Sequence, residues 1–212
     1  MSKLKGRPDK RTAAQQCKGA AMLNARTVSM GNARGTLKER GHDIYETPPV
    51  AVEALLRVEP LPPHVWEPCC GSGNIAEVLR AHGHEVTATD LVADRIDFLM
   101  EWRAPQGVEG IVTNPPFKLA AEFVRHGLAL GVPLVAMLLR LNFLESVGRS
   151  DILKHGPLAR VHIFEDRLPR MHREGWGGPR NETSTTPYAW FVWDRRYNGK
   201  PVLNWIRARG RP

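Results

Sequence analysis

The chain has 212 residues, of which 42% are hydrophobic, and a formal net charge of +8. This length suits one α/β domain with an appendage, and this apolar content is sufficient for a packed core. No run of about 18 apolar residues occurs, and the N-terminal segment lacks the apolar stretch of a secretory signal, so we expect no membrane span and a cytoplasmic location. Cys17, Cys69 and Cys70 lack CxxC spacing, which argues against a disulfide framework or a zinc site, and we expect no bound metal.

The positive charge is concentrated at the N-terminus. Residues 1–40 contain ten Lys or Arg and two acidic residues, which accounts for the whole excess, whereas residues 41–212 are balanced. A basic arm on a neutral domain suits binding to a phosphate backbone, because Lys and Arg displace condensed counterions. A solvated tail without a binding role is the open alternative. We therefore divide the chain into a basic arm, residues 1–40, and a catalytic domain, residues 41–212.

Regular patterns begin at residue 47, where Thr47 can cap a helix that extends to about residue 58. The segment HVWEPCC predicts a buried strand ending near Glu67. Gly71 and Gly73 predict a turn that opens the next helix, and HEVTATD predicts a second strand ending at Asp90.

The second half continues the alternation of strands and helices. Strands are predicted at residues 110–113 and 132–140, and helices at residues 118–130 and 141–156. Two late strands, around residues 160–166 and 188–195, are separated by a polar loop, residues 167–187. Trp190 and Trp193 lie on alternate faces of the last strand and are expected in the core.

This order of elements indicates an α/β fold with a doubly wound, mainly parallel sheet, in which the late strands form an antiparallel hairpin. The 17 residues after residue 195 are too few for another domain.

Three polar segments lie where strands are predicted to end, and ligands of open α/β sheets bind beyond the carboxyl ends of strands. Gly71 and Gly73 allow a ligand to approach the backbone closely, but Ala76 occupies the place of the third glycine of a dinucleotide fingerprint. Glu67 would repel phosphate and favour a cation, and Asp90 is placed to accept hydrogen bonds from ribose hydroxyls. These features fit a nucleoside with a positive group, such as S-adenosylmethionine.

The third segment, GIVTNPPF, ends a strand abruptly. Pro115 and Pro116 lack backbone N–H groups, and the residue before a proline is held extended. The Asn114 amide oxygen and neighbouring carbonyls are therefore acceptors with few competing donors, directly before the aromatic ring of Phe117. This arrangement suits a planar ligand that carries an NH₂ group.

Together these segments resemble the motifs of DNA adenine-N6 methyltransferases of the kind carried by phages and prophages, which implies a restriction–modification setting. EPCCGSG is similar to motif I, TATD to motif II and NPPF to motif IV. DIYETPPVAVEALL resembles motif X, with Tyr45 and Thr47 on its YxTP core. RIDFLM resembles the segment whose acid contacts the cofactor adenine, which falls on Asp97, with Phe98 beside the ring. The similarity covers residues 42–117, and the late strands extend it to about residue 195.

The resemblance implies the Rossmann-like class I fold, S-adenosyl-L-methionine as cofactor and DNA as partner. The implied catalytic residues are Asn114, Pro115, Pro116 and Phe117. The implied cofactor-binding residues are Tyr45, Thr47, Glu67, Cys69, Gly71, Gly73, Asp90, Leu91, Asp97, Phe98 and Asn114. Candidate nucleic-acid-binding residues lie in the arm and in the late loop: Lys3, Lys5, Arg7, Lys10, Arg11, Arg167, Arg170, Arg173 and Trp176.

Sequence-specific members of this family carry a sizeable target-recognition region, and this chain has little room for one. Only 24 positions separate Asp90 from Asn114, so we expect low or short sequence specificity. Methylation of cytosine N4, of RNA or of a protein glutamine amide remains an alternative, because the same acceptors suit each of these groups. A non-catalytic nucleic-acid-binding module is a further alternative, against which the intact acceptor cluster argues.

Overall fold

The computed structural model of the protein describes residues 45–172, 177 and 182–209. The strands are β1 (His64–Glu67), β2 (Glu85–Ala88), β3 (Gly110–Thr113), β4 (Leu134–Arg140), β5 (Leu158–Phe164), β6 (Tyr188–Asp194) and β7 (Val202–Ile206). The helices are α3 (Pro49–Leu56), α4 (Asn74–Ala81), α5 (Ala120–Ala129) and α6 (Ser150–Leu153). Short 3-10 turns are η1 (Phe98–Met100), η2 (Phe117–Leu119), η3 (Leu141–Leu144) and η4 (Val147–Arg149).

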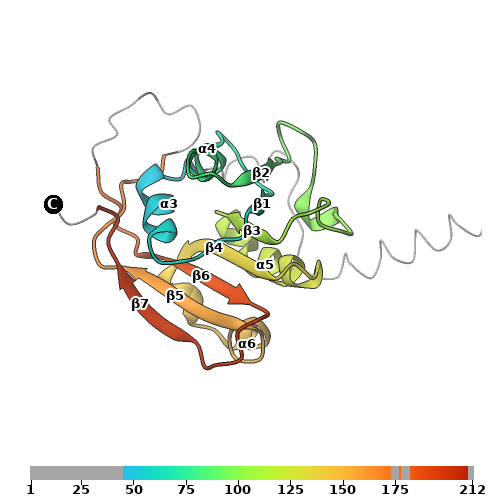
Figure 1. Ribbon diagram of the computed structural model, residues 1–212. Helices are drawn as coiled ribbons and strands as arrows, with labels where there is room; N and C mark the ends of the chain where they lie inside the picture. The colour runs from blue at the N-terminus through green and yellow to red at the C-terminus, as the bar shows by residue number, and fades with distance from the viewer. Residues whose placement is uncertain (1–44, 173–176, 178–181, 210–212) are drawn as a thin grey trace, which may run out of the picture. The chain divides into compact units, whose positions relative to one another are not determined.

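Within the described residues the strands form one seven-stranded sheet in the order β2-β1-β3-β4-β6-β5-β7 (Figure 1). Strands β1 to β4 are parallel to one another, and β6 is antiparallel to both β4 and β5. Strand β7 runs parallel to β5. The predicted α/β sheet, mainly parallel with a late antiparallel hairpin, is confirmed.

Helices cover both faces of the sheet, so its central strands are buried on both sides. In β4, Leu134 and Ala136 pack in the core under α3 and α4, whereas Val135 packs in the core under α5 and α6 (Figure 1). In β6, Trp190 and Trp193 are fully buried on opposite faces, as predicted.

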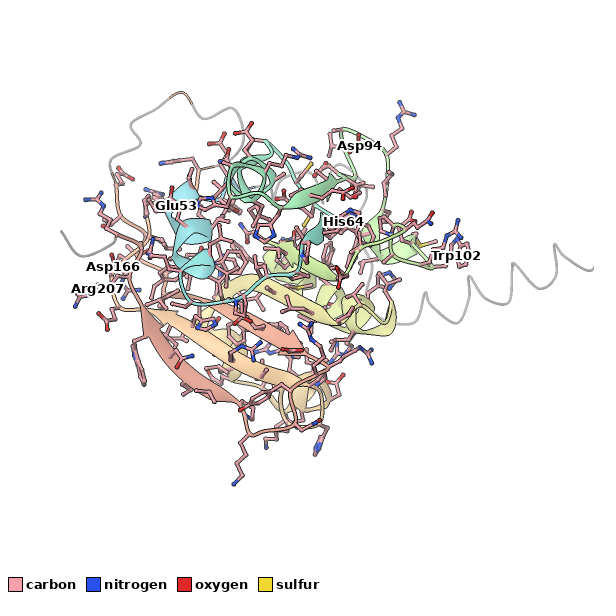
Figure 2. The ribbon with its side chains drawn as sticks, viewed as in Figure 1. Glu53, His64, Asp94, Trp102, Asp166 and Arg207 are labelled. Atoms are coloured by element: carbon pink, nitrogen blue, oxygen red, sulfur yellow. The ribbon has the colours of Figure 1, made fainter. Side chains whose placement is uncertain are left out.

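Two predicted features differ from the structure. The single helix expected over residues 141–156 is instead η3, η4 and the short α6, because the Ser146 hydroxyl accepts a hydrogen bond from the Gly148 N–H and starts a new turn. The sequence predicts no strand after residue 195, yet Val202–Ile206 form β7. Its carboxyl end lies beside that of β5, where Asp166 and Arg207 are neighbours (Figure 2).

The order of the first strands places the candidate site. The chain passes from β1 to β2 on one side and then to β3 on the other, so a crevice opens between the carboxyl ends of β1 and β3. Glu67 ends β1, and Asn114 follows β3. No helix within the described residues is long and apolar enough to cross a bilayer.

Candidate active site

Asn114 lies at the tip of β3, and its side-chain amide is held in one orientation. Its Nδ2 donates to Thr47 Oγ1 at 3.0 Å and lies 3.7 Å from Met171 Sδ. Its Oδ1 is buried and has no hydrogen-bond partner among the described residues. A buried acceptor without a donor costs about 1–3 kcal/mol, so its persistence points to a ligand that donates there.

Thr47 connects three segments of the site. It is buried, its hydroxyl accepts the Asn114 hydrogen bond, and its carbonyl accepts one from Asn74 Nδ2 at 3.0 Å. The expectation that Thr47 caps the first helix is wrong: Pro48 is the N-cap of α3, and no side chain caps this end. The hydroxyl instead accepts the hydrogen bond from Asn114 at the tip of β3.

Glu67 ends β1 as a nearly completely buried acid. Its side chain accepts a hydrogen bond from the Ala76 N–H at 2.8 Å, at the start of α4. Burial raises the pKa of Glu67 to about 8, and the neighbouring Asp90 adds to the rise. The carboxyl group therefore carries a proton at neutral pH until a cation approaches it.

Asp90 braces the glycine turn. One carboxylate oxygen accepts from the Gly71 N–H at 3.0 Å, and the other accepts from the Val92 N–H at 2.7 Å. Gly71 and Gly73 have φ values of 48° and 85°, which favour glycine. Asp90 is also buried, so its visible role is to fix the turn; contact with a ribose stays a prediction.

Tyr45 and Thr47 face Glu67 and Gly71 across a cavity of only about 10 Å³. A space of this size holds at most one water molecule. The space between these residues is therefore too small for a nucleoside in this structure.

Asp97 directly precedes η1, and Phe98 is its first residue. The Asp97 carboxylate caps this turn by accepting from the Leu99 N–H at 3.1 Å. Phe98 is 2% exposed and packs with its centroid 5.2 Å from Trp66 and 4.9 Å from Phe123. The ring of Phe98 thus belongs to the core in this structure, and its contact with a cofactor adenine stays a prediction.

Cys69 packs behind the tip of β3. Its Sγ is 2.8 Å from Thr113 Oγ1, and burial raises the pKa of the thiol well above its usual range. The raised pKa favours the protonated thiol at neutral pH. Leu91, the other cofactor candidate beside Asp90, is half-buried.

A larger cavity, about 290 Å³, lies beside the tip of β3 and is lined by Phe117. Its other aromatic walls are Tyr45 and Tyr188, whose ring centroids are 5.7 and 5.8 Å from that of Phe117. The sequence-predicted residue Arg170 also lines it, whereas Arg167 is exposed outside its lining. Arg173, Trp176 and the five candidate basic residues of the arm lie outside the described residues.

The predicted site residues do not include Arg140, Met171, Tyr188 or residues 183–186, which the fold also brings to this cavity. Arg140 ends β4, Tyr188 begins β6 directly opposite it, and Met171 follows β5. One signal was available for Arg140, because it is a charged residue that ends a continuous apolar strand, at the same edge as Asn114. No group of three or more His, Cys, Asp or Glu side chains within the described residues could hold a metal ion.

The sequence matches no protein-family model and no curated protein. The fold is similar to that of a modification subunit assigned to a type I restriction enzyme from Vibrio vulnificus, with a TM-score of 0.51 and 15% identity over 91% of this chain. The chain spans about half of that subunit, 51% of its length.

A predicted O-methyltransferase from Agrobacterium tumefaciens is also similar, with a TM-score of 0.50, 12% identity, and coverage of 76% of this chain and 86% of that protein. A class I S-adenosylmethionine-dependent methyltransferase assigned in Listeria monocytogenes gives a TM-score of 0.49 at 12% identity, with coverage of 90% and 72%. The sheet order, the covering helices and the similarity to the Vibrio and Agrobacterium proteins show that the chain has the Rossmann-like fold of class I methyltransferases.

Proposed function

We propose that this chain transfers a methyl group from S-adenosylmethionine to the exocyclic N6 amine of adenine in DNA. The observation that carries the proposal is the buried Asn114 Oδ1, an acceptor without a donor among the described residues, at the switch point of the sheet. Thr47 fixes the amide so that this oxygen, and not the NH₂ group, is presented to a ligand.

The residues around the glycine turn fit the proposed cofactor. S-adenosylmethionine supplies an electrophilic methyl group on a sulfonium and also carries an ammonium group. The acid of Glu67 is placed to ionise beside a cation, and Gly71 and Gly73 leave the turn free of side chains. Asp90 holds the turn in shape.

Asn114 acts on the substrate amine through hydrogen bonds. The lone pair of an exocyclic amine is delocalised into the ring, which makes the nitrogen a poor nucleophile. When Asn114 Oδ1 and the Pro115 carbonyl each accept one N–H, the nitrogen is drawn towards sp³ geometry and its lone pair is freed. This effect is orientation with electrostatic preorganisation, and Phe117 offers an aromatic surface for a flipped-out base.

Three features support DNA as the substrate. The excess charge of the chain lies in its basic arm, the fold is similar to that of a restriction-enzyme modification subunit, and an aromatic cavity adjoins Asn114. The described residues contain no separate recognition domain, which supports low or short sequence specificity.

The test is to incubate the full chain with isotope-labelled S-adenosylmethionine and separate DNA, RNA and protein substrates. Mass spectrometry of digested nucleosides should find N6-methyladenine from DNA. Asn114→Ala should lower the rate about 100-fold or more, by analogy with the loss of one oxyanion-type hydrogen bond. Asn142→Ala is the matched control, since Asn142 is exposed in η3, and should retain the full rate. Equal rates for Asn114→Ala and wild type, or label in protein alone, would contradict the proposal.

A further inference from the structure

We propose that Arg140 makes the cavity beside Asn114 an anion-binding site, which holds a backbone phosphate next to the nucleotide that is methylated. This inference rests on the proposed function and narrows its substrate to a nucleic acid strand rather than a protein amide. It adds a binding residue that the sequence motifs do not include.

The cavity has the size and walls for one nucleotide. Ligand pockets are commonly about 300–1,000 Å³, and this one, at about 290 Å³, lies at the small end of that range. Three aromatic rings, those of Tyr45, Phe117 and Tyr188, line it, and residues 183–186 add hydroxyl groups. Met171 connects it to the reacting centre, because its Sδ is 3.7 Å from Asn114 Nδ2.

Arg140 places a positive charge on the wall of this cavity. Its guanidinium carbon lies 4.4 Å from the ring centroid of Phe117, and the residue pairs with Tyr188 across β4 and β6. The residue is exposed, so its side chain is open to a ligand. These aromatic contacts orient the guanidinium without neutralising it.

Arg140 has no carboxylate partner within the described residues, unlike several other arginines. Arg125, Arg160 and Arg207 each pair with a carboxylate, but no ion pair of Arg140 occurs within the described part of the chain. The second guanidinium at the cavity, that of Arg170, pairs with Glu182 at 2.5 Å. Among the described residues, Arg140 is therefore the one cation of the cavity lining without a carboxylate partner.

The combination of groups favours a nucleotide over a glutamine side chain. A glutamine amide could donate to Asn114 Oδ1, but it is neutral and aliphatic and uses neither the arginine nor the aromatic walls. A nucleotide provides the amine, a planar ring and a phosphate, and arginine binds phosphate oxygens with two parallel hydrogen bonds. Asn114 and Arg140 would thus recognise two ends of the same nucleotide.

The experiment uses the full chain and a short DNA duplex with one mismatched adenine, which lowers the cost of base flipping. Binding is measured by fluorescence anisotropy at several salt concentrations. Arg140→Gln should weaken binding about tenfold and reduce the slope of log affinity against log salt by about 1. Arg140→Lys should recover part of the affinity, since it keeps the charge but not the planar fork.

Arg103→Gln is the matched control. Arg103 is also exposed, and its guanidinium carbon also lies 4.4 Å from an aromatic centroid, that of Trp102. Asp166 and Arg207 follow the carboxyl ends of β5 and β7, and Trp102 lies on the opposite side of the domain from them (Figure 2). Arg103→Gln should bind the duplex as wild type does.

A second duplex identifies the phosphate. Replacing one phosphate next to the mismatched adenine by a neutral methylphosphonate should weaken binding to wild type about tenfold and leave Arg140→Gln unaffected. Wild-type affinity in Arg140→Gln, or an equal loss in both proteins, would overturn the inference. Methylation of a protein amide at the same rate by wild type and Arg140→Gln would also overturn the inference. The chain would then still be a methyltransferase, but not one that binds a phosphate at Arg140. If Asn114→Ala methylates as wild type does, the proposed function fails, and the phosphate test still reports on Arg140.

Discussion

At the scale of single residues, the proposed site depends on the contact between Thr47 and Asn114. The two residues are 67 positions apart in the chain, yet their side chains are joined by a 3.0 Å hydrogen bond. Because Thr47 accepts from Nδ2, the amide oxygen is left for the substrate amine in the proposed mechanism. We therefore propose that Thr47 is a positioning residue for Asn114, in addition to its predicted contact with the cofactor.

Thr47→Val keeps the shape of the side chain and removes the hydroxyl. We expect kcat to fall about 10- to 100-fold with little change in the affinity for S-adenosylmethionine, because the Asn114 amide loses the partner that orients it. Steady-state kinetics and calorimetric titration with the cofactor separate these effects. Thr87→Val is the control, since it removes a 3.0 Å hydrogen bond to His64 far from the tip of β3 and should leave kcat unchanged. Equal kcat values for Thr47→Val and Thr87→Val would refute the positioning role.

Glu67 is a second residue of the proposed site, and its burial makes its contribution to stability depend on pH. Burial raises the pKa of Glu67 to about 8 in the folded protein, from an ordinary value of 4.5. Between these two pH values the folded protein keeps a proton that the unfolded chain has lost. The contribution of Glu67 to stability is therefore fully present below about pH 4.5 and is lost as pH rises towards about 8. Each unit of pKa shift corresponds to about 1.4 kcal/mol.

Glu67→Gln removes this dependence while it keeps an acceptor for the Ala76 N–H. We expect the variant to match wild type in unfolding free energy at about pH 5 and to exceed it by a few kcal/mol at about pH 8. Urea denaturation at both pH values measures the difference. The same variant should bind S-adenosylmethionine more weakly than wild type. Parallel pH profiles for the two proteins would show that Glu67 is not a buried, titrating acid.

At the scale of elements, a buried ionic network holds the segment after α3 to the sheet. Glu59 accepts two hydrogen bonds from Arg160 of β5, at 2.7 and 2.8 Å, and one from His162 at 2.9 Å. Asp194 at the end of β6 also pairs with Arg160, at 3.0 Å. Burial alone would raise the pKa of Glu59, but the hydrogen bonds from His162 and Arg160 hold it below its usual value.

Glu59→Gln should destabilise the protein by about 3 kcal/mol, because it leaves a partly buried guanidinium without its bidentate partner. Asp194 lies opposite Leu134, the first residue of β4, so the network is at the edge of the sheet away from Asn114. At a temperature where the variant is folded, its kcat should therefore equal that of wild type. Glu165→Gln breaks an exposed pair with Arg207 and should cost far less stability than Glu59→Gln, because solvent screens that pair. Thermal denaturation of the two variants compares them; equal losses would show that the network does not stabilise this edge.

The elements that were predicted wrongly show why local patterns are insufficient. Residues 141–156 carry helical spacing, but Gly148 and the Ser146 hydrogen bond divide them into separate turns. Strand β7 lacks the pattern of a buried strand, since Leu203 and Trp205 are exposed, and it is a strand because β5 offers its edge to the segment. Neighbouring elements decide both cases.

At the scale of the whole molecule, the division of charge is the main prediction for substrate binding. Residues 1–40 hold all of the excess charge of +8, and the rest of the chain is balanced. Non-specific affinity for DNA depends on how many phosphates are neutralised. The arm should therefore set the affinity for DNA, whereas the chemistry belongs to the site at the carboxyl ends of the strands.

This division is tested by replacing the five basic residues with Gln in one variant: Lys3, Lys5, Arg7, Lys10 and Arg11. The slope of log affinity against log salt should fall by up to about 4, because each neutralised phosphate contributes about 0.9. KM for DNA should rise, and kcat at saturating DNA and the affinity for S-adenosylmethionine should stay at wild-type values. An unchanged salt slope would show that the arm is a solvated tail.

The sequence by itself determined which residues end the strands, because the period of apolar residues and the positions of Gly and Pro are local signals. Glu67, the glycine turn, Asp90 and Asn114 were predicted in this way, together with the doubly wound sheet. Only the tertiary structure decided which of these residues meet. It joined Thr47 to Asn114, moved Phe98 into the core, and brought Arg140 and Tyr188 to the cavity. The reason is physical: pairing between distant strands and packing across the sheet arise from contacts that no local pattern encodes.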